Sequence, residues 1–429
     1  MPTRHIVAAL VLTLSCSVSQ AQEKTIVLDG ARIHSVSGPV IESGRLVVSK
    51  GKIVAVGTSD DVEIPAGSDV IDAKGKVIIP GLVDTHSHLG VASRPHEASN
   101  SDGNESTGPV QSVVRALDSV NVMDPGFQMA LSGGLTTANI MPGSGNVIGG
   151  QTVYVKLRGR TIEEMQIKAD GVLGGLKMAN GENPKRYGTR NLAPKTRMKV
   201  AALQRTEFMK ARDYMRKWQR YRSKLADGDQ DATPPDTDLT MEPLVEVLQG
   251  KRTVHFHTHR ADDILTVLRL KQEFGFELVI QHGTEGYKVI REIAAAGVPV
   301  SMTIVDSPGG KAEVVDFIEA CGLELTAAGV SIHVNTDDPV TESRFFLRTA
   351  SAVVRGGLDT ATALKAITLN PAQAMHLGHR VGSLEVGKDA DFVLLSGEPF
   401  SIYTRVLQTW IEGEKLFDLD DEFQRLYQT

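Results

Sequence analysis

Cysteine is nearly absent from this chain of 429 residues, which contains only Cys16 and Cys321. Cys16 lies in an N-terminal segment that we expect to be cleaved, so one thiol remains and no internal disulfide can form. A domain without disulfides depends on its hydrophobic core for stability. Because a single thiol is more often a packing residue than a nucleophile, we expect Cys321 to be buried.

The chain also lacks an excess of charge of one sign. Its 46 Lys and Arg residues are balanced by 52 Asp and Glu residues, which gives a formal net charge of −6. Nucleic-acid binding requires clustered excess Lys and Arg, so no nucleic-acid partner is expected. Two signatures are missing as well. No Gly-x-Ser-x-Gly motif supports a serine hydrolase, and no GxxxxGK[ST] motif supports a nucleotide-binding loop.

The N-terminal apolar run, Ile6 to Leu14, is too short for a membrane-spanning helix, which needs roughly 20 apolar residues. It follows a charged pair and leads to Ser19-Gln20-Ala21, an arrangement typical of a secretory signal. We therefore expect residues 1–21 to be removed and the mature protein to be exported, either to the periplasm or out of the cell, with no membrane span. A lipoprotein anchored through Cys16 is the alternative, and Thr13 three places before it argues against that modification.

Strand-like segments occupy both ends of the remaining chain, in residues 22–79 and 379–429. They are rich in β-branched residues and show no helical periodicity. The predicted strands are 25–28, 43–48, 52–57, 381–384 and 390–395. Their similar character predicts that the two ends pair into one small β-sandwich beside the main domain.

Residues 80–378 show an alternation of short apolar runs with longer helical stretches. Helices are expected, for example, at 262–274 and 287–296. The strand candidates are 77–79, 134–140, 172–178, 253–256, 277–280, 298–302 and 330–334. Strands alternating with helices indicate an α/β fold with a parallel sheet, and about eight repeats favour a (β/α)8 TIM-type barrel.

One segment, residues 206–240, interrupts this alternation. It begins with a basic, helix-like stretch at 206–225 and continues with an acidic, proline-containing run at 227–238. We interpret the segment as a solvated surface insertion. A lid over the active site is the alternative.

The strongest chemical signal is Asp84-Thr85-His86-Ser87-His88, which directly follows the apolar run 77–83. Side chains at positions i and i+2 of a strand point to the same face. His86 and His88 can therefore bind one ion from a single strand end, as histidines do in zinc sites. Two histidines at this spacing also occur by chance, so the pair alone is a weak signal.

Further polar residues follow three other apolar runs. They are the cluster of His255, His257 and His259, the single His282, and the pair Asp337-Asp338. Each lies at the C-terminal end of its run, which is where barrel enzymes place their active-site groups. Simple packing roles are the alternative, and the shared position of all four clusters argues against it. We expect His255 to point deeper into the barrel and to pack or orient its neighbours.

The chain resembles the amidohydrolase superfamily, in the branch of the imidazolonepropionases and related dipeptidases, over essentially the whole mature sequence. The matching motifs are Pro80-Gly81-Leu82-Val83-Asp84-Thr85-His86-Ser87-His88, His257-Thr258-His259, Gln281-His282-Gly283, Asn335-Thr336-Asp337-Asp338-Pro339 and Gly382-Ser383-Leu384-Glu385-Val386-Gly387-Lys388-Asp389-Ala390-Asp391-Phe392. The resemblance implies a barrel flanked by the terminal β-sandwich and a small-molecule substrate.

The resemblance also implies the ligand set of a metal site. His86 and His88 would bind one ion, His257 and His282 would bind a second ion or assist the first, and Asp337 would be both ligand and proton acceptor. Histidine with carboxylate suits a divalent metal, zinc first, with manganese and iron also open.

In binuclear members of such families, a carboxylate from the fourth strand bridges the two ions, often a carboxylated lysine. Lys177, within 174–179, has the right place in the order. Carboxylation would remove its positive charge and supply two oxygens. Glu182 offers the same oxygens unmodified. Both are candidate ligands, with Lys177 slightly favoured, and the number of ions, one or two, stays open.

These residues predict hydrolysis of a carbon–nitrogen bond in an amide, cyclic amide or dipeptide-like substrate. A divalent metal lowers the pKa of its water to near 7. We expect Asp337 to accept the proton and pass it to the leaving nitrogen, while His259 or His282 donates to the oxyanion. Two alternatives remain, a deaminase of a heterocyclic amine and a non-catalytic barrel retained for binding. The oligomeric state is not predicted.

Polar loops at 93–105 and 142–151 are candidates for substrate contact, although the second is glycine-rich and has a turn with positive φ as its alternative explanation. Arg186 and Arg260 are candidates to bind a substrate carboxylate through two hydrogen bonds. Ordinary surface roles are the alternative for both.

Overall fold

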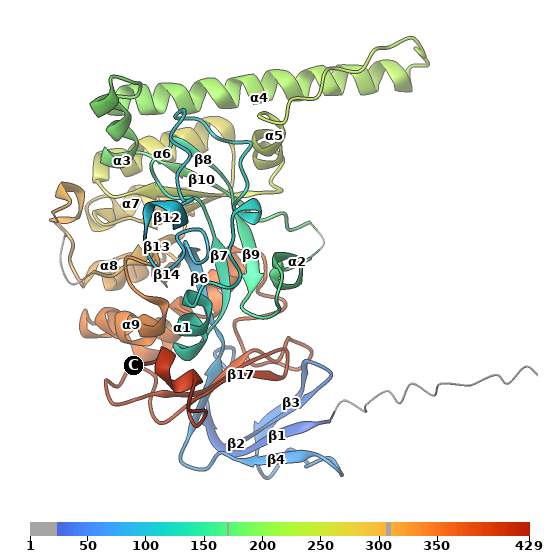
Figure 1. Ribbon diagram of the computed structural model, residues 1–429, viewed down its shortest axis with the longest axis vertical. Coiled ribbons are helices and arrows are strands. Elements are labelled where there is room, and N and C mark those ends of the chain that lie inside the picture. Colours follow the sequence, from blue (N-terminus) through green and yellow to red (C-terminus); the bar gives the residue numbers. More distant parts are fainter. Residues whose placement is uncertain (1–23, 170, 306–309) are drawn as a thin grey trace, which may run out of the picture.

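The computed structural model of the protein describes residues 24–169, 171–305 and 310–429. The predicted signal segment lies outside these residues. In Figure 1, a body of central strands with helices on its outside stands above a sheet built from both ends of the chain. Across the described ranges, no helix combines the length and the apolar character needed to cross a membrane.

Both ends of the chain form one eight-stranded sheet, in the order β17-β16-β15-β5-β1-β2-β3, with β4 paired to β1. The two ends meet where β15 runs antiparallel to β5, with Phe392 opposite Pro80. The strands are β1 (Ile26–Ile33), β2 (Ile41–Ser49), β3 (Lys52–Thr58), β4 (Asp69–Asp72), β5 (Val77–Pro80), β15 (Phe392–Leu395), β16 (Val406–Ile411) and β17 (Glu414–Asp418).

Pairing of the two ends is therefore as predicted, but a two-layered sandwich is not confirmed, because all eight strands belong to one sheet. Leu28, Ile33, Phe392 and Trp410 are buried together against it. Two strand assignments are corrected. Residues 381–384 form a bend and no strand, so this part of the sheet begins at β15. The run 77–79 becomes β5 of this sheet, so the central strands begin with the next apolar stretch.

Apart from Gln151 at the end of β8, all residues of the central strands are buried, as expected for a sheet covered on both faces. They are β6 (Leu82–Ser87), β7 (Leu135–Ile140), β8 (Ile148–Gln151), β9 (Val153–Lys156), β10 (Gly175–Ala179), β11 (Thr253–Thr258), β12 (Leu278–His282), β13 (Val300–Thr303) and β14 (Ile332–Asn335). The strands β10 to β14 run parallel to one another, and β6 runs parallel to β7.

The fold is TIM-barrel-like, but the described strands form a six-stranded and a three-stranded ladder and not one closed barrel. The departure from eight parallel strands occurs at β8 and β9, which pair antiparallel with β10 and β7. Only residues 141–147 separate β7 from β8. Parallel neighbours need a crossover of about a dozen residues or more, so this short connection reverses the chain direction.

Helices pack outside the central strands (Figure 1). They are α1 (Gly126–Ser132), α2 (Ile162–Met165), α3 (Glu182–Lys185), α4 (Arg197–Ala226), α5 (Glu242–Leu248), α6 (Ala261–Phe274), α7 (Ile290–Ala296), α8 (Cys321–Ala327), α9 (Phe346–Arg355), α10 (Thr360–Ala366) and α11 (Leu369–Ala374). The predicted helices at 262–274 and 287–296 correspond to α6 and α7. Gly275 ends α6 in the left-handed conformation that glycine favours. Cys321 is buried, as expected.

The helix predicted at 206–225 begins earlier, because Thr196 caps α4 by accepting a hydrogen bond from the Lys199 amide. The buried residues of α4 lie between Val200 and Tyr214. Its C-terminal part extends beyond the body of the protein (Figure 1).

Candidate metal centre

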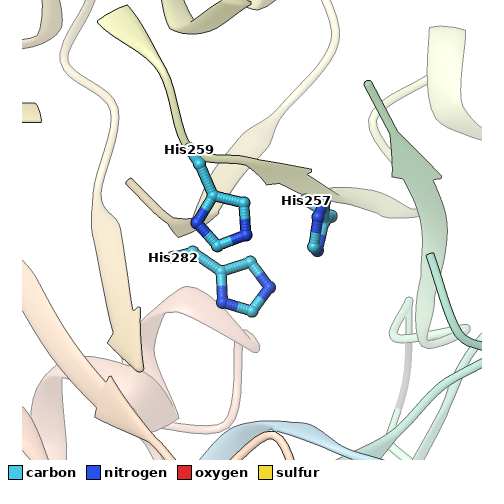
Figure 2. A group of neighbouring side chains, drawn as sticks. All are labelled: His257, His259 and His282. Atoms are coloured by element: carbon cyan, nitrogen blue, oxygen red, sulfur yellow. The ribbon is translucent and has the colours of Figure 1, made fainter. Parts of the chain in front are cut away.

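The histidines and the aspartate singled out in the sequence meet at the carboxyl ends of the central strands. Their possible ligand atoms form two groups, and within each group these atoms lie within 4.8 Å of one another. We call them the His-His-Asp group, made of His86, His88 and Asp337, and the three-histidine group, made of His257, His259 and His282. Figure 2 shows the second group, with two of its rings facing each other.

In the His-His-Asp group, one carboxylate oxygen faces both rings. Asp337 Oδ1 lies 3.2 Å from His86 Nε2 and 3.1 Å from His88 Nε2. His88 Nδ1 lies 2.7 Å from the carbonyl oxygen of Met141. Because a carbonyl only accepts hydrogen bonds, Nδ1 carries the proton and Nε2 presents its lone pair to the site.

A similar argument applies to His282. The Asn335 Nδ2 group donates to the carbonyl of Ser301 at 3.0 Å, which fixes the orientation of the amide. Asn335 Oδ1 therefore accepts from the Thr303 hydroxyl at 2.7 Å, and that hydroxyl must accept from His282 Nδ1 at 2.8 Å. The lone pair of His282 Nε2 is left free, and this buried atom has no hydrogen-bond partner in the part of the chain that the structure describes.

The two groups adjoin. The rings of His86 and His282 are 5.0 Å apart, and Asp337 Oδ2 lies 4.0 Å from His282 Nε2. His282 has φ 72° and Asp337 has φ 49°, in the left-handed region that non-glycine residues seldom adopt. Such strained residues cluster at functional sites, where the surrounding structure holds them.

Burial lowers the pKa of His86, His257, His259 and His282 well below 6.5. Neighbouring cationic side chains contribute to the same shift. These histidines are therefore neutral, and the neutral ring is the form that binds a metal. The Nε2 atoms of His86 and His88 face the Asp337 carboxylate, and this set of acceptors fits a divalent cation. The buried Nε2 of His282 beside them has no hydrogen-bond partner among the described residues, which would be costly without a cation.

Lys177 on β10 is completely buried, and its Nζ lies 2.9 Å from His86 Nε2 and 3.1 Å from Met141 Sδ. Burial lowers the pKa of Lys177 to about 7. A neutral amine, which is the form that reacts with carbon dioxide, is therefore accessible. Glu182, the first residue of α3, belongs to neither ligand group. The bridging role of either residue stays a prediction.

The other candidates occupy different positions. His255 is fully buried, beside the Tyr154 hydroxyl at 3.1 Å and Gln281 Nε2 at 3.0 Å, in the deeper orienting position expected for it. Arg260 is paired with Asp262 at the surface, and Arg186 is exposed. The two polar loops pack on each other, since Asn104 Oδ1 accepts from the Gly145 amide at 2.6 Å.

Two features were missed from the sequence. Lys311 Nζ lies 2.7 Å from His259 Nε2 and 3.4 Å from His257 Nε2. Its position beyond the end of a central strand was the signal that could have identified it. The second is the separate role of Asp338, which the sequence pattern marked only as part of a pair with Asp337. The Asp338 carboxylate faces away to Arg94 at 2.8 Å and to the Ser343 amide at 2.8 Å, so it supports the loop and leaves Asp337 to face the histidines.

Residues 77–420 match the amidohydrolase family, and the chain belongs to that family. It is 30% identical to amidohydrolase tasK of Hapsidospora irregularis over 87% of this chain, although it spans only 40% of the length of that relative. It is 23% identical to an imidazolonepropionase of Streptococcus pyogenes, over 88% of this chain and 91% of the relative. A crystal structure of an amidohydrolase from Thermotoga maritima is 39% identical and superimposes with a TM-score of 0.85, over 92% of this chain and 100% of that one.

Family and site together define a metal-dependent hydrolase that acts on carbon–nitrogen bonds of a small molecule. The family assignment supports an enzyme over the alternative of a non-catalytic barrel. A structural neighbour of similar fold, an adenosine deaminase from Xanthomonas campestris with bound zinc, is 19% identical with a TM-score of 0.53 and supports the fold alone.

Proposed function

We propose that the protein hydrolyses the amide bond of a cyclic amide or peptide-like molecule outside the cytoplasm, with zinc held by the histidines and Asp337. The observation that carries this proposal is the position of Asp337 Oδ1, which lies 3.2 Å from His86 Nε2 and 3.1 Å from His88 Nε2. His86 is neutral because burial lowers its pKa. His88 carries its proton on Nδ1, so its Nε2 has a lone pair for a metal. Similarity to relatives named imidazolonepropionase supports the cyclic amide class. The N-terminal signal pattern supports export.

His86 and His88 would hold the metal with Asp337, and His257 and His282 would hold a second ion or complete the first site. Lys177, once carboxylated, would supply bridging oxygens from β10, and its contact with His86 Nε2 supports this choice over Glu182. When bound, the divalent cation supplies a Lewis acid for the carbonyl and lowers the pKa of water to near 7.

The protein's own residues perform the proton transfers. Asp337 accepts the proton of the attacking water and carries it to the leaving nitrogen, which is general acid–base catalysis by one carboxylate. Its strained backbone at the end of β14 aims the carboxylate at the histidines. Thr303 keeps His282 in the tautomer that leaves Nε2 without a proton, and the Nδ1 proton of His259 faces the Thr284 hydroxyl at 2.7 Å. Neither ring therefore offers a free N–H to a developing oxyanion, contrary to the role expected from the sequence.

A substrate screen with product analysis tests the proposal. The purified protein, loaded with zinc, is offered dipeptides, N-acyl amino acids, cyclic amides and heterocyclic amines. We expect a new carboxylate from one of the amides, and loss of both turnover and metal in His86→Ala. Ammonia released from a heterocyclic amine, with every amide untouched, would establish a deaminase. Full turnover by the His86→Ala variant would contradict the assignment of this ligand.

A further inference from the structure

Lys311 contacts the three-histidine group directly, and no role has so far been given to it. Its Nζ lies 2.7 Å from His259 Nε2 and 3.4 Å from His257 Nε2. An ammonium group has three donors and no acceptor. His259 Nε2 therefore directs its lone pair at the Lys311 ammonium, and His259 Nδ1, 2.7 Å from the Thr284 hydroxyl, carries the ring proton. His257 Nε2 faces two donors, the Lys311 ammonium and Asn183 Nδ2 at 3.3 Å.

The position of Lys311 is supported by a network of ion pairs. The lysine precedes a turn of 3-10 helix, Ala312–Val314, in which Glu313 is only 4% exposed. Arg197, at the start of α4, pairs with the Glu313 carboxylate and with Asp263 of α6, where its Nε lies 2.7 Å from Oδ2. Paired buried charges hold one geometry because breaking the pair is costly. The turn is thus tied to two helices, and the ammonium is directed at the histidines by a fixed element.

Lys311 contacts the same histidine nitrogens that would bind a metal ion in the three-histidine group. A ligand lone pair can be given to an ammonium hydrogen or to a metal, but not to both. Two cations at the same histidines would also repel each other in a site that is largely removed from water. Lys311 and a second metal ion therefore exclude one another. The His-His-Asp group also has a lysine contact, between Lys177 Nζ and His86 Nε2 at 2.9 Å, but it contains the Asp337 carboxylate, which offsets positive charge there. The three-histidine group contains no carboxylate.

We propose that Lys311 is a built-in competitor for the second metal ion. With Lys311 in place, the enzyme holds one ion in the His-His-Asp group. The three-histidine group accepts a second ion only when the Lys311 ammonium moves away. This inference rests on the proposed metal-dependent function and goes beyond it, because it sets the order and the relative affinity of two ions.

Titration with cobalt(II) at a fixed pH tests the inference without any substrate. The full-length mature protein is stripped of metal, and its uptake is followed by visible absorption and by elemental analysis after dialysis. We expect wild-type protein to bind one ion tightly and a second weakly. Lys311→Met should bind the second ion about tenfold more tightly or better, as is typical for groups that act on metal ligands. Lys311→Arg, which retains the charge, should behave as wild type, and so should Lys365→Met, an exposed lysine on α10.

Two additional variants locate the effect. Lys311→Gln should reproduce the gain and serves if Lys311→Met does not fold. The double variant His257→Ala with Lys311→Met should lose the gain, because it lacks a ligand of the second ion. Equal affinity for the second ion in wild type and Lys311→Met would overturn the inference while leaving the proposed function intact. Failure of wild-type protein to bind any ion would overturn the proposed function as well.

Discussion

The two neighbouring aspartates after β14 offer the sharpest test of the proposed chemistry. Asp337→Asn keeps the shape of the side chain but removes the carboxylate that lies 3.1–3.2 Å from His86 and His88. A general base contributes about 10²- to 10⁴-fold to rate, which corresponds to about 2.7–5.5 kcal/mol of transition-state stabilisation. We expect kcat/KM to fall within or beyond that range, because an amide cannot accept the proton.

Asp338→Asn is the matched control, one residue away. The Asp338 carboxylate pairs with Arg94 at 2.8 Å, and Asp124 also faces that guanidinium at 3.5 Å. Loss of the Asp338 charge should lower the free energy of unfolding by about 3 kcal/mol at most, which is near the lower end for breaking a buried pair. The value of kcat should be retained. Steady-state kinetics on the substrate found by the screen, with urea unfolding in parallel, measure both effects. Asp337→Asn with kcat/KM within threefold of wild type would refute the reasoning.

Three further predictions concern stability and metal affinity. Lys156 is buried against Asp389 at 2.6 Å and Asp391 at 3.0 Å, so Lys156→Met should lower the free energy of unfolding by about 3–5 kcal/mol. Lys52→Met, which changes a side chain that is 48% exposed, should lower it by about 1 kcal/mol or less. Equal urea midpoints for the two variants would contradict this prediction. Thr303→Val removes the hydroxyl that accepts the His282 Nδ1 proton, so the ring is no longer held in one tautomer. Metal binding at His282 should weaken about 10- to 100-fold in Thr303→Val but not in Thr303→Ser. Unchanged metal uptake by Thr303→Val in calorimetry would count against this prediction. Burial lowers the pKa of His333 to about 3, so the unfolded state alone takes up a proton below pH 6.5 and stability falls as pH decreases from 6.5 towards 3. His333→Leu should reduce that slope by about 1 kcal/mol per pH unit, and an unchanged slope in urea titrations between pH 5 and 7 would exclude the effect.

Much of the site follows from local rules that operate on the sequence. His86 and His88 share a face because strand side chains alternate, and the ends of parallel strands bring His257, His282 and Asp337 to one edge. The deeper position of His255 follows from the same alternation, two residues before His257. These rules require only the strand positions, and the apolar runs before these particular histidines and before Asp337 show them clearly.

Other features depend on interactions that a linear pattern does not contain. The reversal at β8 and β9 comes from a short connection whose pairing partners lie elsewhere in the chain. Whether the terminal strands form one sheet or two depends on how β5 and β15 pair, not on the composition of either. Lys311 was missed because no histidine-like spacing marks it, and only the folded loop brings its ammonium to His259.

Anomalous X-ray scattering from crystals of the purified protein, recorded above and below the zinc absorption edge, tests the central claim most directly. The account predicts a peak about 2.0–2.2 Å from His86 Nε2, His88 Nε2 and an oxygen of Asp337. Protein that carries zinc in solution but shows its strongest peak at any other group of residues would contradict it.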